Sequence, residues 1–451
     1  MQQRFASYEE AIRYLFTLTN YEKGFNLKPR TTPKLGLERM AKLLEFVGNP
    51  ESRLRAVHVA GTKGKGSTAT MAASVLAAAG YRTGLYLSPH VEDVRERIQV
   101  DGRWIPQDAV CDHLNRMFDY LRRCEAKEDG LYSPTFFEAF TAIAFMHFGA
   151  EKLDFAVAEV GMGGRLDATN VLQPLVCGIT PVSMDHMERL GNTLAEIAGE
   201  KAGIIKPGVP VVCGPQRPEA LDVIRQRCAE QNAPLFVFNE DFGVESAPGG
   251  LRISTWAGSI DRVRLAMRGE HQAVNAATAA AMLAVLQDSG AVCLTADQIR
   301  DGLATAFCPA RVELIRKHPA TVVDAAHNPA SVRALLETLR TEFRFDRLIC
   351  VFAVARDKDV EGILRLIAER ASHVIFTTMD NPRAATPDEL AATMRKIGFA
   401  GVSVQHDHRL ALGEAESLAY ADDLICVCGS FYLAGDVRKT LKLKAEASAK
   451  K

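Results

Sequence analysis

The residues best suited to chemistry form a glycine- and lysine-rich segment, Gly61–Thr68, between an apolar run and a helical pattern. Glycines let backbone N–H groups turn toward a phosphate, a following helix N-terminus adds positive potential, and Lys65 supplies a full charge. Ser67 or Thr68 offers a hydroxyl for Mg²⁺. The segment is not a strict P-loop, because Val59 stands where the first glycine would be and a glycine separates Lys65 from the hydroxyl. We predict a phosphate-binding loop, the alternative being a glycine-rich turn with solvated lysines.

Two polar segments follow apolar strand patterns further along the chain. Glu159 lies at the end of Phe155–Val160, and Asp185 and His186 come just after the pattern that ends at Thr180. In an open parallel sheet, ligands bind at the carboxyl ends of the strands. Glu159 is therefore a candidate Mg²⁺ ligand, and His186 a candidate metal ligand or catalytic group. The alternatives are a solvated loop acid and a buried core histidine.

Later candidates carry weaker signals. Lys201 is either aimed at a phosphate or metal site or solvated at a helix end, and its spacing alone favours the second. Asn275 lies at the start of an Ala-rich helix. Its amide either forms hydrogen bonds with the edge of a nucleotide base or caps the helix. Arg311, Asp324 and His327 follow a break in the pattern. An arginine and an acid beside a cleft suit γ-phosphate and ribose contacts.

Short apolar runs alternate with longer amphipathic ones, which is typical of βαβ units and a mainly parallel sheet. The strands predicted in the first series are Ala56–Ala60, Thr83–Leu87, Phe155–Val160, Val176–Thr180 and Pro210–Cys213. Those predicted in the second are Ala320–Asp324, Arg347–Val354, His373–Thr377, Val402–Val404 and Asp423–Cys428. A break near Pro309 predicts the boundary between two domains.

The remaining segments complete this pattern. The predictions are helices over Tyr8–Leu18, Gly36–Val47 and Gln272–Leu286, a loop over Tyr21–Lys34, and a small antiparallel piece within Asp241–Arg264. The Lys- and Ala-rich tail, Leu441–Lys451, is predicted to fray.

Composition excludes several classes of protein. The 451 residues include 54 Lys+Arg against 55 Asp+Glu, so bulk electrostatics do not hold this chain on nucleic acid. No run approaches the length of a membrane span, and the N-terminus lacks the apolar region of a signal peptide. The 10 Cys show no C-x-x-C spacing, which favours reduced thiols in a cytoplasmic protein.

Taken together and in order, these motifs resemble the folylpolyglutamate synthase/dihydrofolate synthase family. That family is the folate branch of the Mur-ligase-like ATP-dependent amide ligases. The resemblance covers nearly the whole chain. Besides the motifs above, it rests on the segments Gly24–Arg39, Leu87–His90, Pro134–Glu138, Glu159–Asn170, Glu200–Ile204, His271–Asn275, Asp324–Asn328, Lys358–Val360 and Gly429-Ser430.

The resemblance implies an α/β architecture in two parts. Residues 1–308 would form a P-loop-type, mainly parallel sheet domain that binds ATP and carries the pterin-binding loops. Residues 309–451 would form a smaller Rossmann-like α/β domain on the glutamate and ATP side. The family also suggests a monomer that takes small-molecule substrates and neither nucleic acid nor membrane.

The family's roles carry over to matching positions. The ATP-binding residues would be Gly64, Lys65, Gly66, Ser67, Asn275, Arg311 and Asp324. Two Mg²⁺ sites are implied, with ligands Ser88, Glu159 and His186. Lys201 matches the family lysine whose carbamate supports a Mg²⁺ site. The pterin side would comprise the Leu35–Arg39 neighbourhood, Thr135, Phe136, Phe137, Leu166, Asp167 and Ala168.

The implied reaction has three steps. A pteroate or folate carboxylate attacks the γ-phosphate of ATP, the amine of L-glutamate attacks the resulting acyl phosphate, and phosphate leaves. Lys65, Lys201 and His327 would be catalytic, with His327 facing the reaction centre. Lys63 departs from the family, which usually has Asn there, and Cys308 to Ala310 replace a more usual Pro-Gly.

Three functions stay open. The first is a bifunctional ligase that uses both dihydropteroate and reduced folates. The second is a ligase restricted to one of them, and the third is a nucleotide-binding relative that has lost catalysis. The Tyr21–Arg39 segment, with no UDP-binding domain ahead of the phosphate loop, favours the folate branch over a peptidoglycan ligase.

Overall fold

The computed structural model describes residues 5–20, 36–126 and 133–449. The loop predicted over Tyr21–Lys34 lies outside them, as does Leu35. The chain divides into two compact units, each considered by itself below. The first comprises residues 1–89, 95–266 and 272–307, and the second comprises residues 90–94, 267–271 and 308–451.

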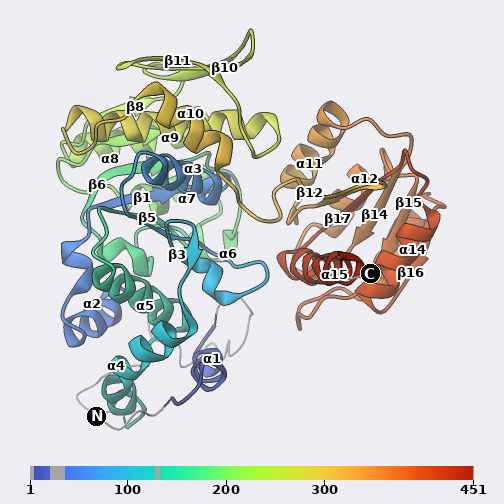
Figure 1. The fold of residues 1–451 in the computed structure, drawn as a ribbon, viewed down its shortest axis with the longest axis horizontal. Helices are drawn as coiled ribbons and strands as arrows, with labels where there is room; N and C mark the ends of the chain where they lie inside the picture. Colours follow the sequence, from blue (N-terminus) through green and yellow to red (C-terminus); the bar gives the residue numbers. More distant parts are fainter. Residues whose placement is uncertain (1–4, 21–35, 127–132, 450–451) are drawn as a thin grey trace. The chain divides into compact units, whose positions relative to one another are not determined.

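The first unit is built on an 8-stranded sheet with the order β4-β3-β2-β5-β1-β6-β7-β8 (Figure 1). The strands are β1 (Ala56–Ala60), β2 (Thr83–Tyr86), β3 (Ile98–Val100), β4 (Arg103–Trp104), β5 (Phe155–Glu159), β6 (Pro174–Ile179), β7 (Val211–Cys213) and β8 (Leu235–Val237). The strands β2, β5, β1, β6, β7 and β8 pair in parallel with their neighbours in this order. The strands β3 and β4 extend the sheet beyond β2 in antiparallel pairing. The mainly parallel sheet is confirmed, and β3, β4 and β8 are additions that the sequence did not predict.

Helices cover both faces of this sheet. The helices between residues 5 and 307 are α1 (Tyr8–Thr17), α2 (Leu37–Phe46), α3 (Lys65–Ala78), α4 (Gln107–Glu125), α5 (Phe136–Ala150), α6 (Met187–Leu190), α7 (Leu194–Ala202), α8 (Pro218–Glu230), α9 (Glu270–Asp288) and α10 (Ala296–Thr305). Cys177 of β6 packs with the core of α7 and α8. Its neighbour Gly178 faces Met282 of α9, so α9 covers the opposite face.

A separate 3-stranded antiparallel sheet confirms the prediction for Asp241–Arg264. It consists of β9 (Gly243–Ala247), β10 (Gly250–Thr255) and β11 (Gly258–Val263). The central strand β10, where apolar and polar residues alternate, pairs with β9 on one side and with β11 on the other.

The second unit has a 6-stranded sheet with the order β12-β13-β17-β14-β15-β16. The strands are β12 (Glu313–Lys317), β13 (Ala320–Val323), β14 (Leu348–Phe352), β15 (His373–Phe376), β16 (Val402–Val404) and β17 (Leu424–Cys428). The helices are α11 (Pro329–Glu342), α12 (Val360–Ala368), α13 (Pro387–Lys396), α14 (His408–Leu418) and α15 (Phe431–Ala449). The antiparallel edge strand β12 was not predicted. The tail that is predicted to fray, Leu441–Lys451, is helical in α15 as far as Ala449.

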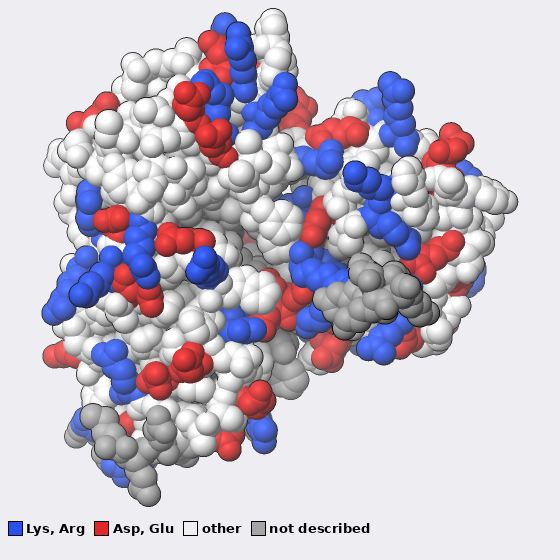
Figure 2. Space-filling model, viewed as in Figure 1, with Lys and Arg blue, Asp and Glu red and all other residues white. Residues whose placement is uncertain are grey.

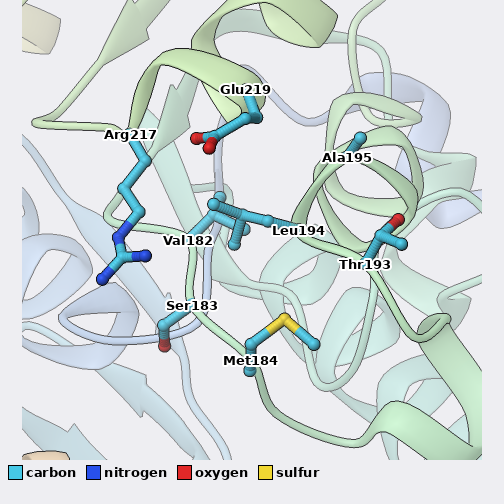
Figure 3. A pocket seen from close by; sticks show the side chains of 8 residues that line it. All are labelled: Val182, Ser183, Met184, Thr193, Leu194, Ala195, Arg217 and Glu219. Carbon is cyan, nitrogen blue, oxygen red and sulfur yellow. The ribbon is translucent and has the colours of Figure 1, made fainter.

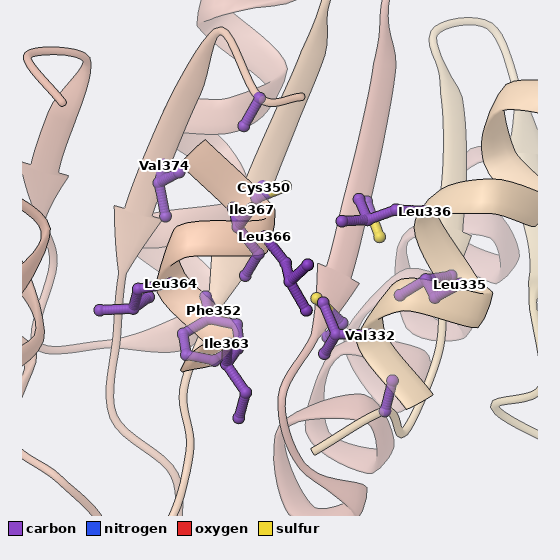
Figure 4. Packing of buried hydrophobic residues seen from close by; sticks show 14 of the residues in the cluster. Val332, Leu335, Leu336, Cys350, Phe352, Ile363, Leu364, Leu366, Ile367 and Val374 are labelled. Carbon is purple, nitrogen blue, oxygen red and sulfur yellow. The ribbon is translucent and has the colours of Figure 1, made fainter. Parts of the chain in front are cut away.

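Alternation along the strands divides the second unit into two cores. Cys350 and Phe352 of β14 point toward the apolar sides of α11, α12 and α13, and Figure 4 shows Phe352 among Ile363 and Leu364. The intervening Val351 packs with α14 and α15 instead. Because both faces are covered, the strands carry apolar residues at nearly every position, as parallel strands between helices do.

A buried ion network anchors α15 within the second unit. Arg438 is 5% exposed, and its guanidinium donates two hydrogen bonds to the Glu313 carboxylate, at 2.7 and 2.9 Å. The same guanidinium pairs with Glu92, which also accepts a hydrogen bond from Lys442 at 2.8 Å. The network therefore ties the C-terminal helix to β12 and to a short segment from much earlier in the chain.

Replacing Arg438 with methionine is expected to destabilise the protein by about 3 kcal/mol, because it leaves the partly buried Glu313 carboxylate without its arginine. Urea unfolding measures the loss. The control is Arg340→Met, since Arg340 pairs with Glu337 only on the exposed surface and its loss should leave the unfolding midpoint nearly unchanged. Equal unfolding midpoints for the two variants would contradict the network's importance.

The molecular surface is mixed in charge. On the face shown in Figure 2, Lys and Arg side chains are interspersed with Asp and Glu side chains. Among the described residues, no helix has the length and apolar character needed to cross a membrane.

Candidate active site around the phosphate loop

The loop between β1 and α3 depends on two glycines. Gly64 has a φ of +88°, and a Cβ there would lie 2.2 Å from Oδ1 of Asn275. Gly61 passes so close to Thr180 that a Cβ would lie 1.9 Å from its hydroxyl oxygen. These approaches bring Asn275 and the end of β6 against the loop. Helix α3 then starts at Lys65, so its N-terminal amides face the space above the loop.

The loop is also tied to the segment after β6. The backbone N–H groups of Thr62 and Lys63 both donate to the carbonyl of Pro181, at 3.0 and 3.2 Å. The Thr62 hydroxyl donates to the carbonyl of Ser183, and the Ser183 N–H donates back to it. The segment that carries Asp185 and His186 is thereby held beside the phosphate loop.

Glu159 lies where the sequence predicts, at the carboxyl end of β5. Its side chain is 6% exposed, and Oε1 lies 3.8 Å from Nζ of Lys65. Oε2 accepts a hydrogen bond from the backbone N–H of Ser88 at 3.0 Å. A Cβ on Gly66 would lie 3.3 Å from the same carboxylate. The structure therefore brings Lys65, Gly66, Ser88 and Glu159 together at one edge of the sheet.

Lys201 is buried, which its spacing did not predict. It is 3% exposed in α7, and its Nζ donates to the carbonyl of Gly61 at 2.8 Å. Burial, reinforced by the charge of Lys65, lowers the pKa of Lys201 to about 7. A small hollow of about 30 Å³ is lined by Lys65, Asp185, His186 and Lys201. Residues of the phosphate loop and of the loop that follows β5 complete its lining. The predicted catalytic lysines thus share one cavity.

Lys63, the departure from the family pattern, turns toward Asp185. Its Nζ lies 3.4 Å from Oδ2 of that carboxylate, and the two side chains are 35% and 20% exposed. The extra cation therefore has an acidic partner across the site, and Lys65 remains the lysine beside Glu159. Asp185 belongs to a motif that the sequence analysis identified. Its pairing with Lys63 could not be predicted from the sequence, because the two residues are more than a hundred positions apart.

The donor set fits magnesium when phosphate oxygens complete it. Mg²⁺ prefers oxygen ligands and uses one or two protein carboxylates plus substrate phosphates. Glu159 and Ser88 supply such oxygens next to the phosphate loop. His186 is exposed and has a left-handed backbone at the start of α6. Within the described ranges, no three His, Cys, Asp or Glu side chains form an all-protein metal cage.

The predicted pterin residues within 135–137 and 166–168 are all buried or half-buried. Thr135 caps α5, with its hydroxyl accepting from the Glu138 N–H. Phe136 is 1% exposed and stacks on Phe16, so its ring belongs to the core. Phe137 instead presses against Gly161, where a Cβ would lie 2.5 Å from its ring. Only Phe137 among the two rings borders the loop that follows β5.

Arg39 has a structural partner. Its guanidinium donates to the Glu138 carboxylate at 2.8 and 3.1 Å, and both side chains are 9% exposed. The pair locks α2 against the start of α5, the element that presents Phe137.

Asp167 folds back onto its own loop. Its Oδ2 accepts from the N–H of Met162 at 3.0 Å, and its Oδ1 accepts from the N–H and the hydroxyl of Thr169 at 3.0 and 2.5 Å. Burial raises the pKa of Asp167, and the Thr169 and backbone hydrogen bonds oppose that rise. Leu166 and Ala168 flank it in this loop. One partner was missed: His58 of β1, whose Nε2 lies 2.8 Å from the Thr169 hydroxyl.

Arg311, Asp324 and His327 form a cluster within the second unit. Asp324 follows β13, where its carboxylate accepts from the N–H groups of Val312 and Ala326, both at 2.7 Å. Burial raises the pKa of Asp324, while the Arg311 charge opposes the rise. The Arg311 guanidinium lies 5.1 Å from the ring centroid of Phe431, and the His327 ring lies 5.9 Å from it. Their contacts with ATP stay a prediction.

A larger hollow of about 420 Å³ is lined by none of the predicted site residues. In Figure 3 the lining side chains of Val182 and Leu194 lie between those of Arg217, Glu219 and Thr193. Its walls are mainly apolar, and they contain neither lysine nor a predicted metal ligand. The chemistry therefore concentrates in the smaller hollow beside the phosphate loop.

Comparison with known proteins supports the resemblance. Residues 310–431 match the Mur ligase, glutamate ligase domain. A relative from Bacillus subtilis (strain 168), named dihydrofolate synthase/folylpolyglutamate synthase, is 35% identical over 448 residues, which cover 97% of this chain and 100% of the relative.

Solved structures agree with this assignment. Mycobacterium tuberculosis folylpolyglutamate synthase complexed with ADP is 34% identical, with a TM-score of 0.84 over 96% of this chain and 99% of that one. Escherichia coli FolC in complex with DHPP and ADP is 29% identical, with a TM-score of 0.86 over 99% of this chain and 100% of that one. The relatives match nearly end to end, so the chain belongs to the folylpolyglutamate synthase/dihydrofolate synthase family of Mur-type ligases.

Proposed function

We propose that this protein is an ATP-dependent ligase that joins L-glutamate to dihydropteroate, to reduced folyl-(poly)glutamate, or to both. The observation that carries the proposal is the position of Lys65. It starts a helix above a glycine loop, 3.8 Å from the buried Glu159, and lines the same small hollow as Lys201. The named relatives from Bacillus subtilis and Escherichia coli support this reading.

The charges of the site suit acyl phosphate formation. A carboxylate that attacks the γ-phosphate of ATP is an anion approaching a polyanion, so positive charge must screen their repulsion. Lys65 and the N-terminal amides of α3 supply that charge from one side. The amine of glutamate then attacks the acyl carbon, forms the amide bond and releases phosphate. Exclusion of water protects the acyl phosphate from hydrolysis.

Glu159 and Ser88, with His186, are the residues that would hold Mg²⁺, which when bound would neutralise charge on the phosphate oxygens. The hydrogen bond from the Ser88 N–H keeps one Glu159 oxygen in place. Lys65 holds the other side of the same carboxylate, so Glu159 stays oriented toward the loop.

Lys201 is suited to become a carbamate. A lysine reacts with CO₂ only through its neutral amine, and the pKa of about 7 leaves much of Lys201 neutral near physiological pH. The reaction forms an N–C bond and releases one proton. The resulting anion would lie among Lys65, Lys63 and Asp185, where it would support a second Mg²⁺ site.

We also propose that the protein acts in the cytoplasm as a monomer. None of its ten cysteines, all of which lie in the described ranges, forms a disulfide, and most of them are buried. Reduced, mostly buried thiols suit a reducing compartment. Size-exclusion chromatography with light scattering tests the monomer directly.

The deciding test is ADP release with Mg²⁺-ATP and L-glutamate, comparing dihydropteroate, tetrahydrofolate and no acceptor. Turnover with both acceptors identifies the bifunctional ligase, and turnover with one identifies a restricted enzyme. If folded protein releases no ADP in response to either acceptor, the proposal is wrong and the non-catalytic alternative gains support. In that case, Lys63→Asn tests whether the extra lysine silences the site.

A further inference from the structure

The larger hollow of the first unit has no role in the chemistry described so far. Its volume of about 420 Å³ is that of a pocket for a small molecule, which is roughly 300–1,000 Å³ in most proteins. Three segments form its walls: residues 182–184 after β6, residues 193–195 at the start of α7, and the start of α8. The hollow is therefore a second place where the first unit could hold a ligand.

The most buried part of the lining is apolar. Val182 is 6% exposed, and Leu194 packs against the same core of α7 and α8. Ala195 is half-buried beside Leu194. Met184 is 45% exposed and adds a thioether, which adapts its shape to an apolar partner. An apolar group that enters the hollow would lie against these side chains and leave water, which favours its binding.

Two opposite charges border the hollow, and both come from the start of α8. Arg217 is the N-cap residue of this helix, and Glu219 lies in its first turn. Both side chains are exposed, and among the described residues neither has a hydrogen-bond or salt-bridge partner. Figure 3 shows their charged ends apart from each other. The guanidinium and the carboxylate are thus both available to a ligand.

This combination of charges selects one class of ligand. A simple carboxylate would be attracted by Arg217 and repelled by Glu219, and a simple amine would meet the reverse. A phosphate group would be repelled by the same glutamate. An amino acid carries a carboxylate and an ammonium group on one carbon atom, so it matches two opposite charges that come from one helix end. Its side chain can then reach the apolar part of the lining.

The wall after β6 also supports the phosphate loop. The backbone N–H of Val182 donates to Oε1 of Gln216 at 2.9 Å, which joins this wall to the segment just before α8. The carbonyl of Ser183 accepts from the Thr62 hydroxyl at 3.2 Å, and the Ser183 N–H donates back to it at 3.1 Å. A ligand in the hollow would therefore brace the segment that holds the phosphate loop in place.

We propose that the larger hollow binds a free amino acid with a large apolar side chain. The amino acid carboxylate pairs with Arg217, its ammonium group pairs with Glu219, and its side chain lies against Val182 and Leu194. By bracing the segment after β6, the bound amino acid lowers the KM for ATP. Only this effect on KM rests on the proposed function, since binding itself needs no turnover.

Isothermal titration calorimetry tests the binding with L-tryptophan, L-phenylalanine, L-methionine and L-leucine as probes. The best of them should bind with a Kd of about 1 mM or lower, as expected for a ligand of this size. L-Alanine has the same charged groups without the large side chain, so it should bind about tenfold more weakly or worse.

Two analogues assign the charges. For tryptophan they are tryptamine, which lacks the carboxylate, and 3-indolepropionate, which lacks the ammonium group. Arg217→Gln should weaken binding of the amino acid about fivefold and leave binding of the amine no weaker. Glu219→Gln should likewise weaken the amino acid and spare the acid. The control is Arg227→Gln, because Arg227 lies near the other end of α8 and pairs with Glu230.

A pair of leucines tests the apolar part of the lining. Leu194 and Leu221 are both half-buried against the same core, and of the two Leu194 lines the hollow. Leu194→Ala should weaken binding about fivefold because it removes apolar contact area. Leu221→Ala should lower stability and leave the Kd unchanged.

Several results would overturn the inference. They are no binding of any of the four probes, the same Kd in Arg217→Gln, Glu219→Gln and the wild type, or equal effects of the two leucine variants. A dimer that Leu194→Arg dissociates would show that a second copy of the chain occupies the hollow instead. An unchanged KM for ATP at saturating amino acid would contradict the bracing. Failure of the proposed function looks different, because acceptor-dependent ADP release would then be absent while binding to the hollow is still measured.

Discussion

Replacement of Lys65 with alanine is expected to abolish acyl phosphate formation, with a loss of turnover of about 10³-fold or more. Lys65 lies at the first turn of α3 and lines the small hollow with Lys201. Its Nζ lies 3.8 Å from Glu159, so removal takes away a cation next to the carboxylate predicted to hold Mg²⁺. The mutation thus removes a positive charge that would screen the phosphates. It also leaves the Glu159 carboxylate without the neighbouring cation.

Acceptor-dependent ADP release measures this loss, and hydroxylamine trapping of the acyl phosphate identifies the step that fails. Lys63→Asn is the matched control on the same loop. Lys63 pairs with Asp185 and Asn is the usual family residue, so this variant should retain most of the turnover. Near-normal turnover of Lys65→Ala would contradict the role assigned to the phosphate loop in the reaction.

Replacement of Lys201 with alanine is expected to lower turnover by about 10²-fold or more, with partial recovery in acetate or formate. The substitution leaves a small space beside Gly61, where the Lys201 amine now donates its hydrogen bond. A short carboxylic acid that enters this space would replace the negative group of the carbamate. Recovery should saturate with acid concentration, as binding to one site does.

Two controls separate this rescue from a salt effect. Sodium chloride at the same ionic strength should not restore Lys201→Ala, and acetate should not restore Lys65→Ala. Absence of any rescue, in a variant that melts like the wild type, would count against the carbamate.

Activity should also depend on pH when CO₂ is limiting. Because the pKa of Lys201 is lowered to about 7, its amine is mostly protonated below that pH and mostly neutral above it. Carbamylation therefore rises as pH increases through about 7, and wild-type turnover should rise with it. Lys201→Ala rescued by acetate should lack this CO₂-dependent rise.

The local features of the fold were predictable from the sequence. The phosphate loop is contiguous, since a strand, a glycine run, a lysine and a helix follow one another within Ala56–Ala78. Glu159 and Asp324 were found because each lies at the carboxyl end of a strand pattern, and the carboxyl ends of parallel strands gather at one edge. The family resemblance then implied which of these residues bind ATP, Mg²⁺ or the acceptor, which the periodicity of apolar residues cannot indicate.

Strand order was beyond such patterns. The alternation of strands and helices predicts a parallel sheet, yet it does not say that β5 lies between β1 and β2. Edge strands such as β12 and β8 are only partly buried. Three of the five residues of β12 are charged and β8 has only three residues, so neither strand gives a long apolar run.

What the sequence by itself determined is the set of reactive groups and the elements that carry them, because these depend on neighbours along the chain. Only the tertiary structure decided which groups meet and which are removed from water. It paired Lys63 with Asp185, buried Lys201 beside Gly61, and joined His58 through Thr169 to Asp167. Burial and long-range pairing set the protonation and orientation of these side chains, and both arise only when distant segments pack together.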